Sequence, residues 1–523
     1  MCAVAQAPES RQLTLNKRET FRSPALLSRP RSPAARPPLA RVFASRFAAR
    51  LPHENSVQYS GYTPPMLPPV TVPSAFAARR SRLAARFTGP ALFVSGLARP
   101  RNFAGNRYPF RAESHFLYFV GRAIEGAALL VAPGTATLFA PPPDPEAELW
   151  AGRQPGLDEL SRELELEVRP IGELKASELT ASLPAQDAES ATWQSELLGR
   201  DVIHGSGFEL EGGDRDLSEA VIDIRLEHDA AAVSQLRFAA RVAERAHRAG
   251  MRATHPGMRE FGVRAPMEAA IVGSGCVCSY NSIVTVHGEV LHNERHDGLL
   301  ADDDLLLADV GAETPEGWAS DVTRVWPARG EFSSTQRAIY DTVLASQLAA
   351  IDAVKPGVRY LDVHRAAGIA LLRGLIDLGI FRGDLEDLYA RGAAALFFPH
   401  GIGHLLGLDV HDMEDLGDRA GYAPGRVRSQ NAGDRYLRLD RDLRPGMCVT
   451  IEPGFYQIPA LLSSAAETAE LESALDRNRL AEFADVRGIR IEDDVLVTQD
   501  GCEVLTSAIP KTTAEVEAAV RDR

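Results

Sequence analysis

The sequence predicts an α+β protein in which a smaller α/β domain precedes a larger α+β domain. The chain has 523 residues, more than one ordinary domain of about 100–200 residues needs. Residues 66–220 carry short apolar strands beside helical segments, which is typical of α/β structure. Residues 221–523 alternate strands and helices irregularly, with hairpins, which favours α+β over a doubly wound sheet.

Residues 1–65 form a basic, proline-rich tail ahead of both domains. Residues 1–50 hold ten Lys or Arg and only two Glu, and the prolines between 29 and 38 exclude a helix or a central strand. Three interpretations stay open: a disordered tail, an organelle transit peptide, and an upstream extension of a chain that starts at Met66. We expect a cytoplasmic protein, with organellar import through the tail as the alternative.

Charge and cysteine content exclude several classes of protein. The net charge is −14 although the tail is basic, so the body is acidic and does not suit a nucleic-acid partner. No apolar run reaches the roughly 18–20 residues of a membrane span. Cys276 and Cys278 lack a second pair for a zinc site, and five cysteines in all indicate a reducing compartment without a disulfide framework.

Local patterns predict the elements of the first domain and the start of the second. Residues 74–86 read as a helix with Ser74 as its N-cap, and residues 209–216 read as a linker. A long helix over 227–249 opens the second domain and ends at Gly250. Apolar runs bounded by Gly and Pro predict strands at 91–94, 127–131 and 137–139.

Asp309 and Asp321 are the first candidate site residues. Each lies in an apolar strand pattern, at 305–310 and 318–325, with turn residues 314–317 between them. A hairpin centred on Pro315 would make the two aspartates a direct cross-strand pair on one face. Two carboxylates so close need a cation or a shared proton, whereas two solvated acids near a turn would be the plain alternative.

Two glutamates and a cluster of histidines add to this pair. Glu452 ends the strand pattern 447–452, and Glu492 lies between the patterns 488–492 and 495–497. Residues 397–412 contain three histidines among glycines and apolar residues, namely His400, His404 and His411. Four carboxylates and a histidine suit a hard or borderline divalent ion such as Mn²⁺. Two such ions would activate a water and polarise a carbonyl or phosphoryl oxygen.

These motifs resemble the Xaa-Pro peptidases, aminopeptidase P and prolidase, from about residue 70 to the C-terminus. The resemblance rests on Ser-Asp-Val-Thr-Arg at 320–324, His-Gly-Ile-Gly-His at 400–404, Thr-Ile-Glu-Pro-Gly at 450–454 and Gly-Ile-Arg-Ile-Glu-Asp-Asp at 488–494. Residues 106–118 match the family's N-terminal domain. The resemblance implies a pita-bread catalytic domain behind a creatinase-like N-terminal domain, and a homodimer.

The resemblance also implies a role for each site residue. The ligands of two divalent ions, with Mn²⁺ favoured, would be Asp309, Asp321, His404, Glu452 and Glu492. Glu452 would shuttle the proton of the attacking water. His292 would lie on the substrate side, with His287 as a weaker competitor, and His411 would stabilise the oxyanion. His400 would line the proline pocket and Arg490 would orient the acids.

The substrate would be a peptide with proline second, and its length stays open. Arg438, in the insertion between His411 and Glu452, falls where prolidases place the arginine that binds the free carboxylate of a dipeptide. The same arginine could also be a solvated residue of a charged loop. We expect Xaa-Pro dipeptides to be favoured, with an Xaa-Pro aminopeptidase as the alternative. A metal-free binding module of the same fold is a remote third option, because all five ligand positions are filled.

Overall fold

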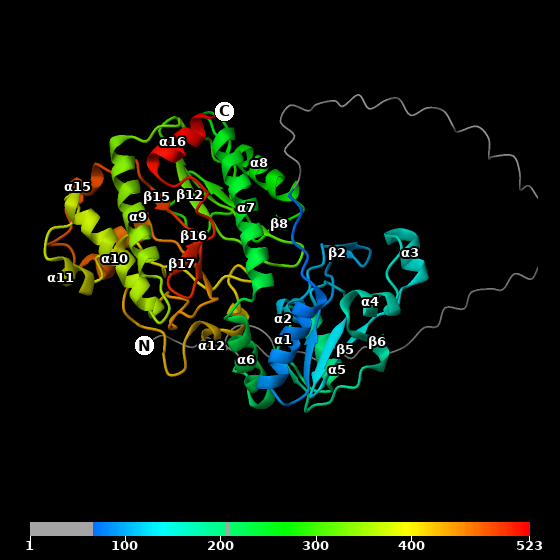
Figure 1. The fold of residues 1–523 in the computed structure, drawn as a ribbon. Coiled ribbons are helices and arrows are strands. Elements are labelled where there is room, and N and C mark those ends of the chain that lie inside the picture. Colours follow the sequence, from blue (N-terminus) through cyan, green and yellow to red (C-terminus); the bar gives the residue numbers. More distant parts are fainter. Residues whose placement is uncertain (1–65, 204–208, 523) are drawn as a thin grey trace, which may run out of the picture. The chain divides into compact units, whose positions relative to one another are not determined.

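The computed structural model describes residues 66–203 and 209–522, so predictions for the tail at 1–65 lie outside the described residues. The described residues form one compact unit (Figure 1). The predicted boundary at 220/221 falls inside one continuous helix, Gly212–Arg225, which also replaces much of the predicted linker 209–216. The division into domains at that residue therefore stays a prediction.

The first part of the unit is built on a five-stranded sheet with strand order β6-β5-β4-β1-β7. Strands β1, β4 and β5 pair antiparallel, whereas β7 and β6 join the edges in parallel. The strands are β1 Ala91–Val94, β2 Pro100–Phe103, β3 Asn106–Arg107, β4 Ala128–Ala132, β5 Thr135–Ala140, β6 Glu167–Pro170 and β7 Ala181–Ser182. The helices are α1 Pro73–Arg86, α2 Ser114–Val120, α3 Pro145–Ala151, α4 Leu157–Leu164, α5 Ala188–Leu198 and α6 Gly212–Arg225.

The predicted cap of the first helix is wrong by two residues. Helix α1 begins at Pro73 and its N-cap is Val72, which makes no side-chain cap. Proline is favoured at the first helical position because its fixed φ suits the helix and its missing N–H is not needed there. The proline therefore fixes the start of this helix, and Ser74 lies inside it.

The second part consists of small sheets between two helix pairs. Its strands are β8 Val277–Cys278, β9 Ile283–Thr285, β10 Leu305–Asp309, β11 Ala312–Glu313, β12 Thr323–Pro327, β13 Cys448–Ile451, β14 Gly454–Tyr456, β15 Gly488–Arg490, β16 Asp493–Val497 and β17 Cys502–Val504. Its helices are α7 Ala230–Ala253, α8 Glu260–Val272, α9 Ser334–Ala353, α10 Tyr360–Asp377, α11 Leu385–Ala390, α12 Asp418–Gly421, α13 Pro459–Leu462, α14 Ala465–Thr468, α15 Arg477–Ala481 and α16 Thr513–Arg521. The three-stranded sheets have the orders β12-β10-β9 and β13-β16-β17.

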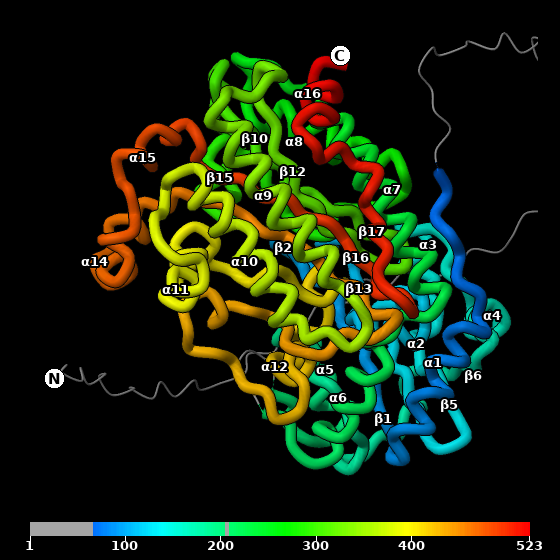
Figure 2. The backbone as a smooth tube through the Cα atoms, turned by 60° about the vertical axis from the view of Figure 1, so that its left-hand side comes forward, coloured from blue at the N-terminus to red at the C-terminus, as the bar shows by residue number. Residues whose placement is uncertain are grey.

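The two helix pairs repeat one local pattern that the sequence analysis did not identify. Helix α7 packs on α8, and α9 packs on α10 (Figure 2). Each pair is joined by a turn with Pro-Gly at its centre, and Gly257 and Gly357 have φ of +85° and +83°. The first pair contacts β8, β9 and β11, and α9 of the second contacts β13, β14 and β15. Helices thus cover the strands that carry the candidate site.

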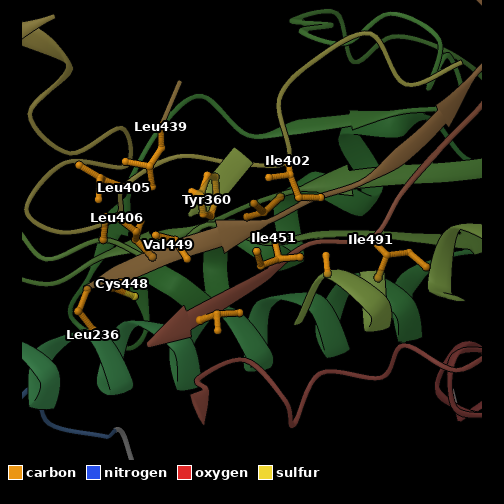
Figure 3. Close-up of a cluster of buried hydrophobic side chains, with 14 of the residues drawn as sticks. Leu236, Tyr360, Ile402, Leu405, Leu406, Leu439, Cys448, Val449, Ile451 and Ile491 are labelled. Atoms are coloured by element: carbon orange, nitrogen blue, oxygen red, sulfur yellow. The ribbon is translucent and has the colours of Figure 1, made fainter. Parts of the chain in front are cut away.

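An apolar cluster supports the segments that hold the candidate ligands. Figure 3 shows Val449 and Ile451 of β13 among buried side chains that include Ile402, Leu405 and Ile491. Because strand side chains alternate between faces, Thr450 and Glu452 point away from this cluster. The cluster therefore fixes residues adjacent to His404, Glu452 and Glu492.

No helix in the described residues is long and apolar enough to cross a membrane.

Candidate active site

The hairpin that carries the two aspartates has a different register from the predicted one. Strand β10 pairs with β12 so that Asp309 lies opposite Thr323, and the predicted direct pairing of Asp309 with Asp321 is therefore wrong. The turn bonds from Gly317 N to Thr314 O and from Thr314 N to Trp318 O centre the hairpin on Glu316 instead of Pro315. A shift of two residues keeps both aspartates on one face, as diagonal neighbours.

Tyr280 joins these two carboxylates. Its hydroxyl oxygen lies 2.5 Å from Asp309 Oδ1 and 2.7 Å from Asp321 Oδ1, so one phenolic proton is shared between them. Both aspartates are buried. Burial, and the neighbouring Asp321 charge, raise the pKa of Asp309 to about 6 although Arg490 opposes this shift.

His404 faces the aspartates from a segment held against β13. Its backbone N–H donates to Thr450 Oγ1 at 3.1 Å, and its Nδ1 donates to the Leu405 carbonyl at 3.0 Å. The other ring nitrogen, Nε2, lies 3.3 Å from Asp321 Oδ2 and 3.6 Å from Glu452 Oε1. Burial opposes protonation of the ring, but these carboxylates outweigh it and raise the pKa of His404. The Nδ1 bond leaves Nε2 as the metal-binding nitrogen.

Gly403 allows the close approach of this segment to β13. Its φ is +154°, and a Cβ at this position would lie 2.2 Å from the Thr450 carbonyl oxygen. Any other residue would push the histidine segment away from the strand. The glycine-rich spacing between His400 and His404 therefore has a direct geometric reason.

The two glutamates complete the acidic group from strand ends. Glu452 follows β13, and Glu492 lies between β15 and β16, where Thr323 Oγ1 donates to its Oε2 at 2.6 Å. Burial raises the pKa of Glu452 to about 7, with repulsion from both aspartates adding to the shift. Burial and the same repulsion raise the pKa of Glu492 well above its usual value. These carboxylates need a cation to ionise together at neutral pH.

Arg490 supplies one positive charge on the edge of this group. It donates from Nη2 to Asp309 Oδ2 at 2.5 Å, from Nε to Thr323 Oγ1 at 2.8 Å and from Nη1 to the Tyr456 hydroxyl at 3.3 Å. The Tyr456 hydroxyl in turn lies 2.9 Å from His400 Nε2. The guanidinium thus fixes one ligand carboxylate and connects it to the histidine beside the substrate cavity.

The donor set fits divalent metal ions. Ligand atoms of Asp321, His404 and Glu492 all lie within 4.8 Å of one another, and Asp309 and Glu452 adjoin them through Tyr280 and His404. Four carboxylates face the single guanidinium of Arg490, which leaves excess buried negative charge. Oxygen-rich sites of this kind suit hard or borderline cations, and the five residues would hold them.

All ten predicted site residues line one cavity of about 440 Å³. They are His292, Asp309, Asp321, His400, His404, His411, Arg438, Glu452, Arg490 and Glu492. His287, the competitor for the His292 role, is not among the lining residues and instead contacts Glu289 through Nδ1 at 3.0 Å. Arg428 and Tyr436 lie beside Arg438 in the lining.

Sequence reasoning missed Tyr280, Tyr456, Thr323 and Glu414. Each acts through a side-chain bond to a predicted site residue, and Glu414 contacts both His411 and Arg438. Three of them had a local signal: Thr323 lies in the Ser-Asp-Val-Thr-Arg motif, Glu414 lies three residues after His411, and Tyr456 lies on the strand that follows the Glu-Pro-Gly turn. Tyr280 lies 29 residues before Asp309, and the fold brings it near the site.

Side chains of the first part of the unit hold the segment that carries His411. Arg225, buried on α6, donates to Asp412 Oδ1 at 2.6 Å and contacts His115 Nδ1 at 2.9 Å. His115 Nε2 lies 2.9 Å from Asp415 Oδ2. Arg111 donates to the Leu408 carbonyl at 2.7 Å. The motif around residues 106–118 therefore supports the catalytic part through polar contacts.

Comparisons with known proteins agree with this geometry. Residues 234–499 match the family model "Metallopeptidase family M24", and residues 76–189 match "Aminopeptidase P, N-terminal domain". Human Xaa-Pro dipeptidase is 32% identical over 79% of this chain and 84% of its own length. A probable Xaa-Pro aminopeptidase of Penicillium rubens is 32% identical over 78% of this chain and 88% of its own.

The structure of Pseudomonas aeruginosa aminopeptidase PepP matches with a TM-score of 0.71 and 30% identity, over 86% of this chain and 98% of that one. The predicted α+β architecture, with a creatinase-like domain before a pita-bread domain, is confirmed. The chain therefore belongs to metallopeptidase family M24 and carries an N-terminal domain of the aminopeptidase P type.

Proposed function

We propose that this protein hydrolyses the peptide bond between an N-terminal residue and a following proline. The observation that carries the proposal is the one cavity lined by five metal-ligand candidates, three further histidines and three arginines. The relatives named as Xaa-Pro dipeptidase and Xaa-Pro aminopeptidase support the same bond specificity. A peptide panel with product identification tests it, as described at the end of the Discussion.

Two divalent ions, with Mn²⁺ favoured, would be held by Asp309, Asp321, His404, Glu452 and Glu492. When bound, they would supply an activated water and polarise the carbonyl that precedes proline. Metal analysis of the purified protein tests this stoichiometry. Less than one ion per chain, without rescue by added Mn²⁺, would instead favour the metal-free binding module.

The chain's own residues would orient the substrate and move protons. Glu452 would accept a proton at its carboxylate and return it to the leaving proline nitrogen. His411 donates from Nδ1 to Glu414, and in its doubly protonated form its Nε2–H would donate to the developing oxyanion. His292 would contact the substrate. His400, held by Tyr456, would line the proline side of the cavity.

We favour Xaa-Pro dipeptides because Arg438 and Arg428 stand together in the cavity lining. An arginine presents paired N–H donors that match a free carboxylate. Arg428 is engaged with both the Asp418 carboxylate and the Leu437 carbonyl, whereas Arg438 bonds Glu414 through Nη1 alone, so Arg438 is the better partner for a substrate carboxylate. The Penicillium relative supports the alternative, an aminopeptidase that accepts longer peptides.

The length preference is tested with Gly-Pro and Gly-Pro-Gly offered to the Mn²⁺-loaded enzyme and to Arg438→Ala. We expect higher kcat/KM on the dipeptide, and a loss of about tenfold or more on the dipeptide in the variant, because a bond to a charged group contributes about 1.5–3 kcal/mol. Better turnover of the tripeptide, unaffected by Arg438→Ala, would establish the aminopeptidase instead.

We further propose a homodimer located in the cytoplasm, with organellar import through residues 1–65 as the alternative. The homodimer rests on the family resemblance, and light scattering of the purified chain tests it. The cytoplasmic location rests on the low cysteine content, and imaging of the full chain beside a chain that starts at Met66 tests it.

A further inference from the structure

Glu414 joins two residues of the cavity that have different proposed tasks. Its Oε2 lies 3.2 Å from His411 Nδ1, and both of its carboxylate oxygens accept from Arg438 Nη1, at 2.8 and 2.6 Å. His411 is the proposed oxyanion residue and Arg438 is the proposed carboxylate-binding residue. One carboxylate therefore contacts both the proposed oxyanion residue and the proposed carboxylate-binding residue.

The contact with Arg438 leaves most of its donors available. Both oxygens of Glu414 bind the same terminal nitrogen of Arg438. Among the contacts of the described residues, Nε and Nη2 of Arg438 have no partner, so they can bind a second carboxylate. A paired Nε and Nη2 edge is the geometry that grips a carboxylate with two parallel bonds. Glu414 thus holds the guanidinium from one side and does not occupy its binding edge.

The backbone before Glu414 is shaped to direct it toward these partners. Met413 is buried and has φ of +61°, a left-handed conformation that is uncommon for a residue other than glycine. Such conformations persist where the surrounding structure requires them, and they concentrate at functional sites. Glu414 also lines a smaller cavity of about 130 Å³ with His404, Arg428 and Arg438. Its placement is therefore specified by the fold.

We propose that Glu414 is a positioning residue that couples recognition of the substrate's free carboxylate at Arg438 to the orientation of His411. The inference rests on the proposed Xaa-Pro peptidase function and adds a specificity-determining residue to it. Glu414 orients Arg438 for the carboxylate of an Xaa-Pro dipeptide and accepts the Nδ1–H bond of His411, which orients the His411 ring. A substrate that lacks the free carboxylate uses only the second of these effects.

Matched substrates separate the two effects. Gly-Pro and Gly-Pro-amide have the same size, but only the first carries a free carboxylate. For Glu414→Ala we expect KM for Gly-Pro to rise by about tenfold, because Arg438 is no longer held in place and loses its bond to the substrate carboxylate. We expect KM for the amide to change less than about twofold. We expect kcat to fall for both substrates, because His411 loses its partner.

A double-mutant cycle with Arg438→Ala tests the coupling directly. In the Arg438→Ala background, loss of Glu414 should no longer change KM for Gly-Pro, although the fall in kcat should remain. Glu414→Gln keeps the size of the side chain and one acceptor oxygen, so it should restore part of the loss. Glu219→Gln, which removes a carboxylate paired with Arg419 at 2.9 Å elsewhere on the surface, serves as the matched control. Equal KM changes on the two substrates, or additive KM effects, would overturn the proposal.

An NMR readout keeps this test separate from the proposed activity. We expect the ¹⁵N shifts of the His411 ring, assigned with His411→Gln, to report a proton on Nδ1 in the wild type and a mixture of tautomers in Glu414→Ala. Identical shifts in both proteins would refute the role of Glu414 even if the enzyme cleaves Xaa-Pro bonds. Absence of proline-peptide hydrolysis by the wild type would refute the proposed function alone.

Discussion

At the scale of single residues, the site depends on side chains that hold the candidate metal ligands in place. Tyr280 shares one proton between Asp309 and Asp321, and Arg490 donates to the other oxygen of Asp309. Partners of metal ligands fix the orientation of the ligands and typically contribute 10- to 100-fold to metal affinity or activity. The sequence could identify the ligands, because the four carboxylates stand in or beside apolar strand patterns, His404 stands in a glycine-rich histidine cluster, and together they match the family motifs; it could not identify Tyr280.

Tyr280→Phe should weaken metal binding by about 10- to 100-fold, because the two aspartates lose the donor that aligns them. Calorimetric titration of the metal-free protein with Mn²⁺ measures the change. Tyr340→Phe is the matched control, since its buried hydroxyl donates at 2.8 Å to the Lys511 carbonyl, away from the site. Equal metal affinity in Tyr280→Phe and wild type would contradict the role assigned to Tyr280.

Glu113→Gln should stabilise the protein at pH 8 but not at pH 5. Burial raises the pKa of Glu113 to about 7 in the folded protein, against about 4.5 when unfolded. A raised folded pKa means that the stability present below the unfolded value is lost as the pH rises through 7. The amide removes this loss. Urea unfolding at both pH values measures the effect, and an equal change at pH 5 and pH 8 would be inconsistent with it.

At the scale of elements, β13 shows what the sequence could and could not predict. Its alternation places Val449 and Ile451 in the core and Glu452 at the site, as the apolar pattern before Glu452 indicates. The predicted register of the β10–β12 hairpin was wrong because the sequence offers several turn residues. The choice between centring the hairpin on Pro315 or on Glu316 depends on tertiary contacts. The two glycine-turn helix pairs were missed because their sequences differ outside a short shared pattern, Pro-Gly-x-Arg-x-x-x-Val at 256–263 and 356–363.

Helix α6 is the element that connects the first part of the unit to the His411 segment. Arg225→Ala would leave Asp412 buried without its charged partner, and we expect a loss of about 3–5 kcal/mol in the free energy of unfolding. Arg237→Ala is the control, because its pair with Glu503 is largely exposed and should contribute less than about 1 kcal/mol. Urea unfolding compares them. Similar losses for the two variants would show that the α6 contact is not a buried ion pair.

At the scale of the whole molecule, the acidic body and the site are linked through metal binding. Four buried carboxylates meet at one cavity, and the pKa values of Glu452 and Glu492 are both raised. In the metal-free protein, ionising all four carboxylates at neutral pH therefore costs free energy of folding, and bound cations would remove this cost. Fold class and both domain families could be predicted from the sequence, because ligand motifs and the 106–118 segment lie in separate stretches. The contacts that join the two parts could not, since they link residues up to about 300 positions apart.

Metal removal should lower stability, and more so at pH 7.5 than at pH 5. With raised folded pKa values, the metal-free protein loses stability as the pH rises toward about 7, because the carboxylates ionise together. Mn²⁺ at 100 times its Kd should restore about 2.7 kcal/mol. Thermal unfolding with chelator or with Mn²⁺ at both pH values measures this. An unchanged Tm on chelation would argue against a metal site among these five residues.

The measurement that tests the central claim most directly is hydrolysis of Gly-Pro, Gly-Pro-Gly and Gly-Ala by the Mn²⁺-loaded full-length chain, with the products identified. We predict release of free glycine from the proline peptides and none from Gly-Ala, with loss of activity in His404→Ala. Cleavage of Gly-Ala as fast as Gly-Pro, or no cleavage of either proline peptide by protein with two bound metal ions, would contradict the proposed function.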